Sequence, residues 1–211
     1  MFDGILFDLD GTLWDATGAV AKSWTLGLEQ LGIQRPPITV EELFPCMGLL
    51  LPDIVERLIP GLDPETIERV ISHCCRVEND YLARHGAPLY PGVEEALAVL
   101  SETYPLFVVS NCEKGYIEAF FAGTDMGKYF TDFESAGNTG LTKAENIALV
   151  VKRHDLKKPV YVGDTALDHK SSVEAGVPFI HAAYGFGSVE DDVPAIRALE
   201  ELEKLLETLG E

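Results

Sequence analysis

Residues 5–13 read Ile5-Leu6-Phe7-Asp8-Leu9-Asp10-Gly11-Thr12-Leu13. The apolar run at the start of this stretch predicts a short buried strand. Because side chains alternate along an extended chain, Asp8 and Asp10 then project to the same side, and Gly11 suits a tight turn out of the sheet. Open α/β sheets bind their ligands at the carboxyl ends of strands, so this stretch predicts a functional site as well as a strand.

The next part of the chain, residues 15–88, is predicted to be entirely helical. Its strongest helix signal begins at Asp63-Pro64, an N-cap residue followed by proline, and continues with apolar residues at helical spacing as far as Gly86. No segment of this part has the pattern of a strand. It therefore reads as a helical insertion after the first strand.

From residue 89 onward, short apolar runs alternate with helical patterns. Four further strands are predicted at residues 106–110, 133–136, 160–163 and 178–182, and a last helix is predicted from Ala195. Strands that alternate with helices favour a mostly parallel sheet with right-handed crossovers.

We therefore expect an α/β fold in two domains. Residues 1–14 and 89–211 would form a Rossmann-like parallel sheet core with helices on both faces, and residues 15–88 an inserted all-helical cap domain. Substrate entry would require cap and core to separate, so we expect hinge motion near residues 14–17 and 86–90.

Composition narrows the range of partners and locations. The net charge is −19, from 16 basic and 35 acidic side chains, which argues against nucleic acid or an anionic membrane as partner. No apolar run has transmembrane length and no basic-then-apolar leader opens the chain, so we expect a cytoplasmic protein. The four cysteines have no metal-ligand spacing and are expected to be reduced. The sequence carries no signal for an oligomeric state.

Further polar residues stand at strand ends or at the starts of the helices beyond them. Ser110 ends one predicted strand, and Asn111 is expected to cap the helix after it; Asp164 ends another strand and is followed by Asp168. Each of these side chains, taken alone, has an ordinary role as a helix cap or a surface residue. Lys143 differs, because a cation in the first turn of a helix is disfavoured by the helix dipole and calls for an anionic partner.

Together these residues resemble the four motifs of the haloacid dehalogenase superfamily, in the phosphatase branch. Asp8-Leu9-Asp10-Gly11-Thr12-Leu13 is similar to the first motif, Ser110 to the second, Lys143 to the third, and Gly163-Asp164-Thr165-Ala166-Leu167-Asp168 to the fourth. The motifs occur in the order of the family and at the predicted strand ends. The resemblance covers essentially the whole chain, although the cap matches only in placement and helical character.

The resemblance implies a role for each of these side chains. Asp8 would be the nucleophile, Asp10 the general acid and base, and Lys143 and Ser110 would bind the phosphoryl oxygens, with Asn111 adding a donor. Mg²⁺ would be held by Asp8, by the main-chain carbonyl of Asp10, by Asp164 and by Asp168, the last either as a direct ligand or, in preference, as an outer-shell one. A hard divalent cation suits this set of oxygen donors and would offset the repulsion between a carboxylate and a phosphate.

The function that we expect is hydrolysis of a small phosphorylated metabolite through an aspartyl phosphate, as in the phosphoglycolate phosphatase-like branch. A sugar phosphomutase of the same superfamily is the first alternative, disfavoured because no histidine lies between Trp14 and Ser23. The second is a catalytically silent binding or regulatory module, against which the retention of every acid argues. Trp14, Asp15 and the pair Met47-Gly48 are candidates for facing the substrate from the cap side.

Overall fold

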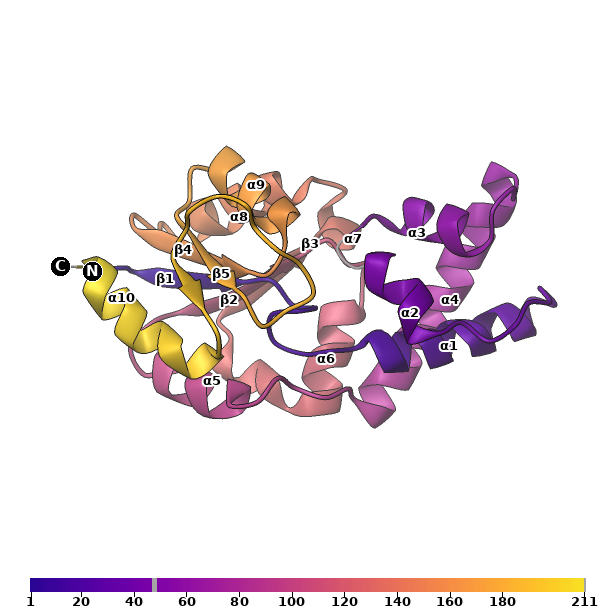
Figure 1. Ribbon diagram of the computed structural model, residues 1–211, viewed down its shortest axis with the longest axis horizontal. Coiled ribbons are helices and arrows are strands. Elements are labelled where there is room, and N and C mark those ends of the chain that lie inside the picture. The colour runs from indigo at the N-terminus through magenta and orange to yellow at the C-terminus, as the bar shows by residue number, and fades with distance from the viewer. Residues whose placement is uncertain (47–48, 211) are drawn as a thin grey trace.

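The computed structural model describes residues 1–46 and 49–210. A parallel sheet forms the centre of the larger half of the molecule (Figure 1). The sheet order in this described part is β3-β2-β1-β4-β5-β6. The strands are β1 (Gly4–Phe7), β2 (Leu106–Ser110), β3 (Asp132–Ser135), β4 (Pro159–Gly163), β5 (Phe179–Ala182) and β6 (Ala195–Ile196). Phe7 on β1 pairs with Val108 on β2 and with Val162 on β4, so the residue after Phe7 emerges between the ends of two neighbouring strands.

Helices cover both faces of the sheet because each strand is apolar on both sides. On β1, Ile5 and Phe7 face the larger core cluster, and Leu6 faces the smaller one. The first face is covered by α5 (Val93–Ser101), α6 (Tyr116–Thr124) and α10 (Leu202–Gly210), and the second by α8 (Lys143–Arg153) and α9 (Ala166–Glu174) (Figure 1). Short helical turns at η2 (Met126–Tyr129), α7 (Ala136–Thr139) and η3 (Leu199–Glu201) complete this half. The expected α/β fold with a parallel sheet and helices on both faces is confirmed.

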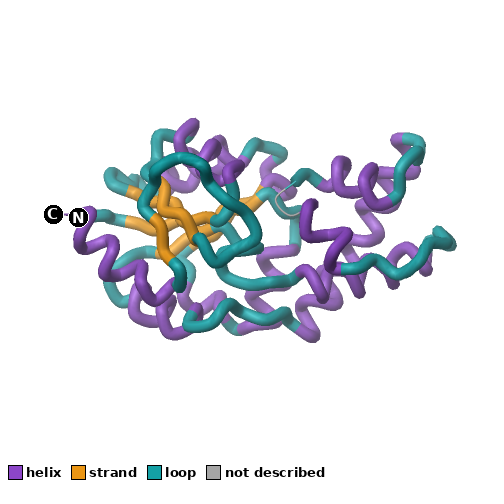
Figure 2. The backbone as a smooth tube through the Cα atoms, in the orientation of Figure 1, coloured by secondary structure: helices purple, strands orange, loops and turns teal. Residues whose placement is uncertain are grey.

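The second half is a cap made only of helices and loops in its described part (Figure 2). It consists of α1 (Thr17–Gln30), α2 (Val40–Leu43), η1 (Phe44–Cys46), α3 (Leu51–Leu58) and α4 (Pro64–His85). Helix α1 packs along α4, and α4 packs against α6 of the sheet half. The start of α4 is the predicted one, with the Asp63 carboxylate accepting the Thr66 N–H at 3.0 Å. An all-helical cap beyond the carboxyl ends of the strands is therefore confirmed.

The two connections between cap and core run beside each other. Trp14 and Leu89 form an isolated antiparallel bridge, the Asp15 N–H donates to the Pro88 carbonyl, and the Tyr90 N–H donates to the Leu13 carbonyl. Domain boundaries at residues 15 and 88 remain a prediction, since the bridge joins the linkers without showing where rigid units begin.

The chain near Ala195 differs from the expected helix. Ala195–Ile196 forms β6 and pairs with His181 and Ala182 of β5, and the α-helix begins only at Leu202. Ile196, Leu199, Leu202 and Leu206 do face the core, but a strand of two residues has no periodicity of its own that a sequence pattern could reveal.

The four cysteines are free thiols, as predicted. Within the described residues, none of the helices has the length and apolar character needed to cross a lipid bilayer.

Candidate active site

Asp8 and Lys143 meet at the carboxyl edge of the sheet. The Lys143 Nζ lies 2.9 Å from Asp8 Oδ1 and 2.6 Å from Asp168 Oδ1, and the side chains of all three residues are buried. The position of Lys143 follows from the sequence, because the capping box of Thr142 and Glu145 makes Lys143 the first residue of α8. The anionic partner that a cation in a first helical turn requires is therefore present twice over.

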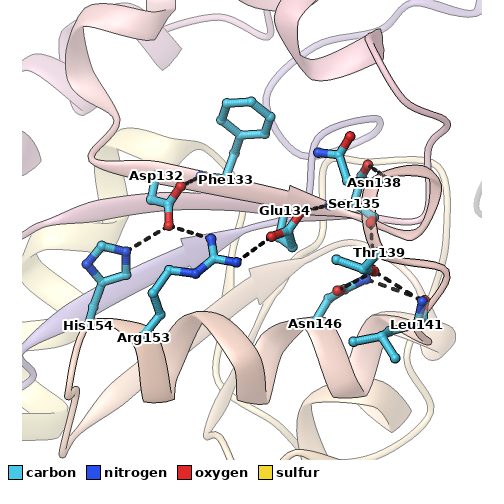
Figure 3. Close-up of polar contacts among 10 residues, drawn as sticks. All are labelled: Asp132, Phe133, Glu134, Ser135, Asn138, Thr139, Leu141, Asn146, Arg153 and His154. Carbon is cyan, nitrogen blue, oxygen red and sulfur yellow. Dashed lines mark hydrogen bonds and ion pairs between the residues drawn. The ribbon is translucent and has the colours of Figure 1, made fainter.

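Helix α8 is fixed at both ends by polar contacts, which Figure 3 shows. At its last residue, the Arg153 guanidinium binds Asp132 at 2.8 Å and Glu134 at 2.6 Å, both on β3. Near its first turn, the Thr139 hydroxyl donates to the amide oxygen of Asn146 at 2.8 Å, and Asn146 is fully buried. These contacts hold the helix axis and so hold the base of the Lys143 side chain.

Asp164 follows β4 and is held by the main chain of a later loop. Its Oδ2 accepts the N–H of Phe186 at 2.7 Å and that of Gly187 at 3.3 Å. Gly11 allows the close approach of the first motif, because its φ is +86° and a Cβ atom there would collide with the Asp164 carboxylate. The other oxygen of Asp164, Oδ1, is buried and has no hydrogen-bond partner among the described residues.

Three carboxylates at this point fit a hard divalent cation. Asp8, Asp164 and Asp168 each offer one oxygen, and these oxygens lie within 4.8 Å of one another. An unpaired buried acceptor such as Asp164 Oδ1 costs about 1–3 kcal/mol, a penalty that a cation bound there would remove. Asp168 is already engaged on both oxygens, by Lys143 and by the Thr165 hydroxyl at 2.6 Å, so its geometry suits holding Lys143 better than direct ligation.

Two acids of the cluster, Asp8 and Asp164, have pKa values raised above the ordinary value of aspartate. Burial, with the charge of Asp168 adding to it, raises the pKa of Asp8 to about 6 against the opposing effect of Lys143. Burial and the charge of Asp8 raise the pKa of Asp164 to about 8. Burial by itself lowers the pKa of Lys143, but the charges of Asp168 and Asp8 outweigh it, so that pKa lies well above its ordinary value. Lys143 therefore stays positively charged, and it is surrounded by three carboxyl groups, those of Asp8, Asp164 and Asp168.

Asp10 has a separate environment beside the nucleophile. Its Oδ1 accepts a hydrogen bond from the Tyr116 hydroxyl at 2.9 Å, and Tyr116 in turn packs edge-on against Trp14. Burial and the charge of Asp8 raise the pKa of Asp10 to about 7. A carboxyl group with this pKa is partly protonated near neutrality, which suits a group that must both give and take a proton.

A pocket of about 730 Å³, including space open to solvent, lies between this cluster and the cap. Asp8, Asp10, Ser110, Asn111 and Lys143 line its core side. The structure thus brings together the side chains of all four predicted motifs, with Asp164 and Asp168 next to Asp8. The helix start expected at Asn111 is wrong, since α6 begins at Tyr116 with Gly115 as its N-cap.

The predicted cap-side residues are placed differently. Trp14 is fully buried and packs against the Phe120 ring, and the Asp15 carboxylate accepts the Thr17 N–H at 3.0 Å; neither is among the described residues that line the pocket. Met47 and Gly48 lie outside the described residues.

Two residues of this region are missed by the sequence analysis. Tyr116 has the spacing of an ordinary core residue, and nothing distinguishes its contact with Asp10 beforehand. Glu78 also lines the pocket; it shares a helix face with Val70, Cys74 and Leu82 at intervals of four residues, so a glutamate on an apolar face was the available signal.

Comparisons with known proteins agree with this geometry. The profile of haloacid dehalogenase-like hydrolases matches residues 5–182. A phosphoglycolate phosphatase from Rhodobacter capsulatus is 30% identical over 198 residues, covering 88% of this chain and 86% of its own. A phosphoglycolate phosphatase from Pseudomonas fluorescens is 25% identical and covers 96% of this chain and 78% of its own.

A solved structure shares the fold at lower identity. A haloacid dehalogenase-like family hydrolase from Streptococcus pneumoniae superposes with a TM-score of 0.80 at 22% identity, covering 97% of this chain and 98% of its own. The family match spans most of the chain and includes every side chain of the buried cluster. This chain belongs to the haloacid dehalogenase-like hydrolase family.

Proposed function

We propose that this protein is a magnesium-dependent phosphatase that hydrolyses a small phosphomonoester through an aspartyl phosphate on Asp8. The observation that carries the proposal is the Asp8 carboxylate, which faces the pocket with Lys143 at 2.9 Å and the unpaired Oδ1 of Asp164 in the same cluster. The names of the relatives support a phosphatase over other members of the family.

In the first half of the reaction, Asp8 attacks phosphorus with the oxygen that is not bonded to Lys143. The bond between phosphorus and the leaving oxygen breaks, and the Asp10 carboxyl group gives its proton to that oxygen, so that the product leaves as a neutral alcohol. Asp10 has a pKa of about 7 and can carry this proton near neutrality. General acid catalysis of this kind contributes about 10²–10⁴ to the rate.

In the second half, Asp10 acts as the base. It removes a proton from a water molecule, the water oxygen attacks the phosphorus of the aspartyl phosphate, and the bond to Asp8 breaks to release inorganic phosphate. Tyr116 holds the Asp10 carboxylate in place through its hydroxyl in both steps.

The charge on the transferred group is balanced by fixed donors. Lys143, held by Asp168, and the hydroxyl of Ser110 at the end of β2 would bind phosphoryl oxygens. Mg²⁺ held by Asp8, Asp164 and the Asp10 carbonyl would offset the charge of the phosphate. Asn111 lines the same wall of the pocket as a further polar group.

The test is hydrolysis of 4-nitrophenyl phosphate with Mg²⁺ and after EDTA treatment, in the wild type and in Asp8→Asn. We expect Mg²⁺-dependent release of phosphate and a rate in Asp8→Asn lower by at least about 10³-fold, because the amide is no nucleophile. Asp80→Asn, at an exposed position on α4, is the matched control and is expected to keep the wild-type rate.

Circular dichroism shows whether Asp8→Asn is folded. A folded Asp8→Asn protein that retains more than about a tenth of the wild-type rate would overturn the assignment of the nucleophile.

A further inference from the structure

The cap side of the pocket is almost entirely apolar. Its described lining residues are Val20, Trp24, Leu43, Cys46, Leu49, Leu51, Ile54 and Glu78. The phosphate would sit on the core side, at Asp8 and Lys143, so these cap residues surround the place of the leaving alcohol. An apolar wall of this kind favours a carbon skeleton over a hydrated polar group.

Glu78 is the one carboxyl group in that wall. Its side chain comes from the middle of α4, is buried to 5% exposure, and has Oε1 bound by the Trp24 ring N–H at 3.1 Å. The Trp24 ring N–H engages one of the two carboxyl oxygens, and the residue lines the pocket. A buried carboxyl group that lines a pocket in this way can form a hydrogen bond with a polar group of the ligand. Burial raises the pKa of Glu78 to about 8, against the opposing hydrogen bond from Trp24, so the group is mainly the neutral acid near neutrality.

The wall also lacks a cation for an anionic leaving group. Lys143 is the only lysine, arginine or histidine among the described lining residues, and it is already shared between Asp8 and Asp168. The two residues outside the described part, Met47 and Gly48, have no cationic side chain either. On the core side, Glu113 adds a further acid next to the leaving group. A carboxylate buried here would have no cation of its own to pair with, which is costly in an apolar environment.

We propose that the pocket selects phosphomonoesters whose leaving alcohol is uncharged and mostly apolar, with one hydroxyl or amide group hydrogen-bonded by Glu78, and that it discriminates against carboxylate-bearing esters such as 2-phosphoglycolate. This inference rests on the proposed phosphatase function. It assigns this chain a substrate class different from the phosphoglycolate in the names of its relatives, because of the apolar residues on the cap side of its own pocket.

The test compares three esters of matched length: 3-hydroxypropyl phosphate, propyl phosphate and 2-carboxyethyl phosphate, with 2-phosphoglycolate as a fourth. In the wild type, we expect kcat/KM for the hydroxypropyl ester to exceed that for either carboxylate ester by at least about tenfold, mainly through KM. The kcat/KM of the hydroxypropyl ester should also exceed that of propyl phosphate, because the propyl chain offers the Glu78 carboxyl group no hydrogen-bonding group.

Variants of Glu78 test whether this side chain causes the preference for the hydroxypropyl ester over propyl phosphate. Glu78→Met removes the polar group at similar volume, and we expect the preference for hydroxypropyl over propyl phosphate to fall to about one. Glu78→Gln keeps an acceptor for Trp24 and a polar group for the hydroxyl, and should retain the preference. Glu68→Gln, on the exposed face of the same helix, is the matched control and should leave all ratios unchanged.

The outcomes separate the two proposals. Carboxylate esters hydrolysed as efficiently as the hydroxypropyl ester would overturn the inference while leaving the phosphatase proposal standing. An unchanged hydroxypropyl preference in a folded Glu78→Met protein would likewise overturn it. Failure to release phosphate from any ester, 4-nitrophenyl phosphate included, would overturn the proposed function itself.

Discussion

At the scale of the residue, the protein buries more carboxyl groups than it has cations to balance. Burial is the largest cause in each case, and it raises the pKa values of Asp8, Asp10, Glu78 and Asp164 to about 6, 7, 8 and 8. Their ordinary values are 3.8 for aspartate and 4.5 for glutamate. The folded protein therefore binds protons more tightly at these groups than the unfolded chain does.

The metal-free protein should lose stability as pH rises from weakly acidic to weakly basic. A carboxyl group whose pKa is raised in the folded state contributes its full stability below the unfolded pKa, and loses it as pH rises through the folded pKa. The window here runs from about 4 to about 8 for the four groups. We expect the Tm of EDTA-treated protein to be at least about 5 °C lower at about pH 8 than at about pH 5.5.

Differential scanning calorimetry over a pH series measures this dependence. The exposed acids with lowered pKa values, such as Glu42 and Asp63, are almost fully ionised in both folded and unfolded states above about pH 5.5 and so do not oppose the trend between the two compared pH values. Glu78→Gln provides a control, because removal of one of the four groups should make the decline shallower. A Tm that stays level or rises across this range would contradict the protonation pattern.

At the scale of the element, α8 matters most because it carries Lys143 at its first residue. Its position depends on Asn146, whose amide oxygen accepts the Thr139 hydroxyl and whose amide group donates to the Leu141 carbonyl at 3.4 Å (Figure 3). Asn146 is fully buried, so truncation would remove both of these hydrogen bonds and leave the Leu141 carbonyl without this donor.

Asn146→Ala should therefore lower both stability and activity. We expect a loss of about 1–3 kcal/mol in the free energy of unfolding, measured by urea denaturation, and a several-fold fall in kcat with 4-nitrophenyl phosphate. Asn138→Ala is the matched control and should change neither quantity. Asn138 is exposed on α7, and its main-chain N–H, which the substitution keeps, donates to the Ser135 hydroxyl. Equal effects of the two substitutions would show that the buried contact does not set the position of α8.

Elements with strong local signals were predictable from the sequence, and those without were not. The capping box of Thr142 and Glu145 gave the start of α8, and Asp63-Pro64 gave the start of α4. Strand β6 was missed because two residues that pair with an open sheet edge show no pattern of their own. Tyr116 and Glu78 reach the site through tertiary packing, which local sequence patterns do not encode.

At the scale of the whole molecule, the site lies where cap and core face each other. Phe44 of the cap packs edge-on against Phe186 of the core at 5.4 Å between ring centroids. The main chain of Phe186 binds Asp164, so this contact joins the cap to the loop that holds a metal-ligand candidate. The two linkers are bridged to each other between Trp14 and Leu89, and the hinge expected at residues 14–17 and 86–90 remains a prediction.

The sequence predicted that the motifs meet at one edge of the sheet. They do so because β1, which carries the first motif, lies at the centre of the sheet. Asp8 after β1 then has the ends of β2 and β4 on either side, which bring Ser110 and Asp164 next to it. What the sequence did not show is the chemistry of the cap wall, since its lining residues come from several helices and a loop that only the tertiary structure brings together.

The central claim is that the phosphoryl group is transferred to Asp8, and acid-quenched labelling with ³²P-acetyl phosphate and Mg²⁺ tests it most directly. Acetate is a good leaving group that needs no proton, so an Asp10→Asn protein should still form the phosphoenzyme but hydrolyse it slowly. We predict that the label accumulates on the peptide containing Asp8, is removed by hydroxylamine as an acyl phosphate, and is absent in the Asp8→Asn protein. The account would be contradicted if the wild type releases phosphate from acetyl phosphate while the Asp10→Asn protein carries no label at Asp8.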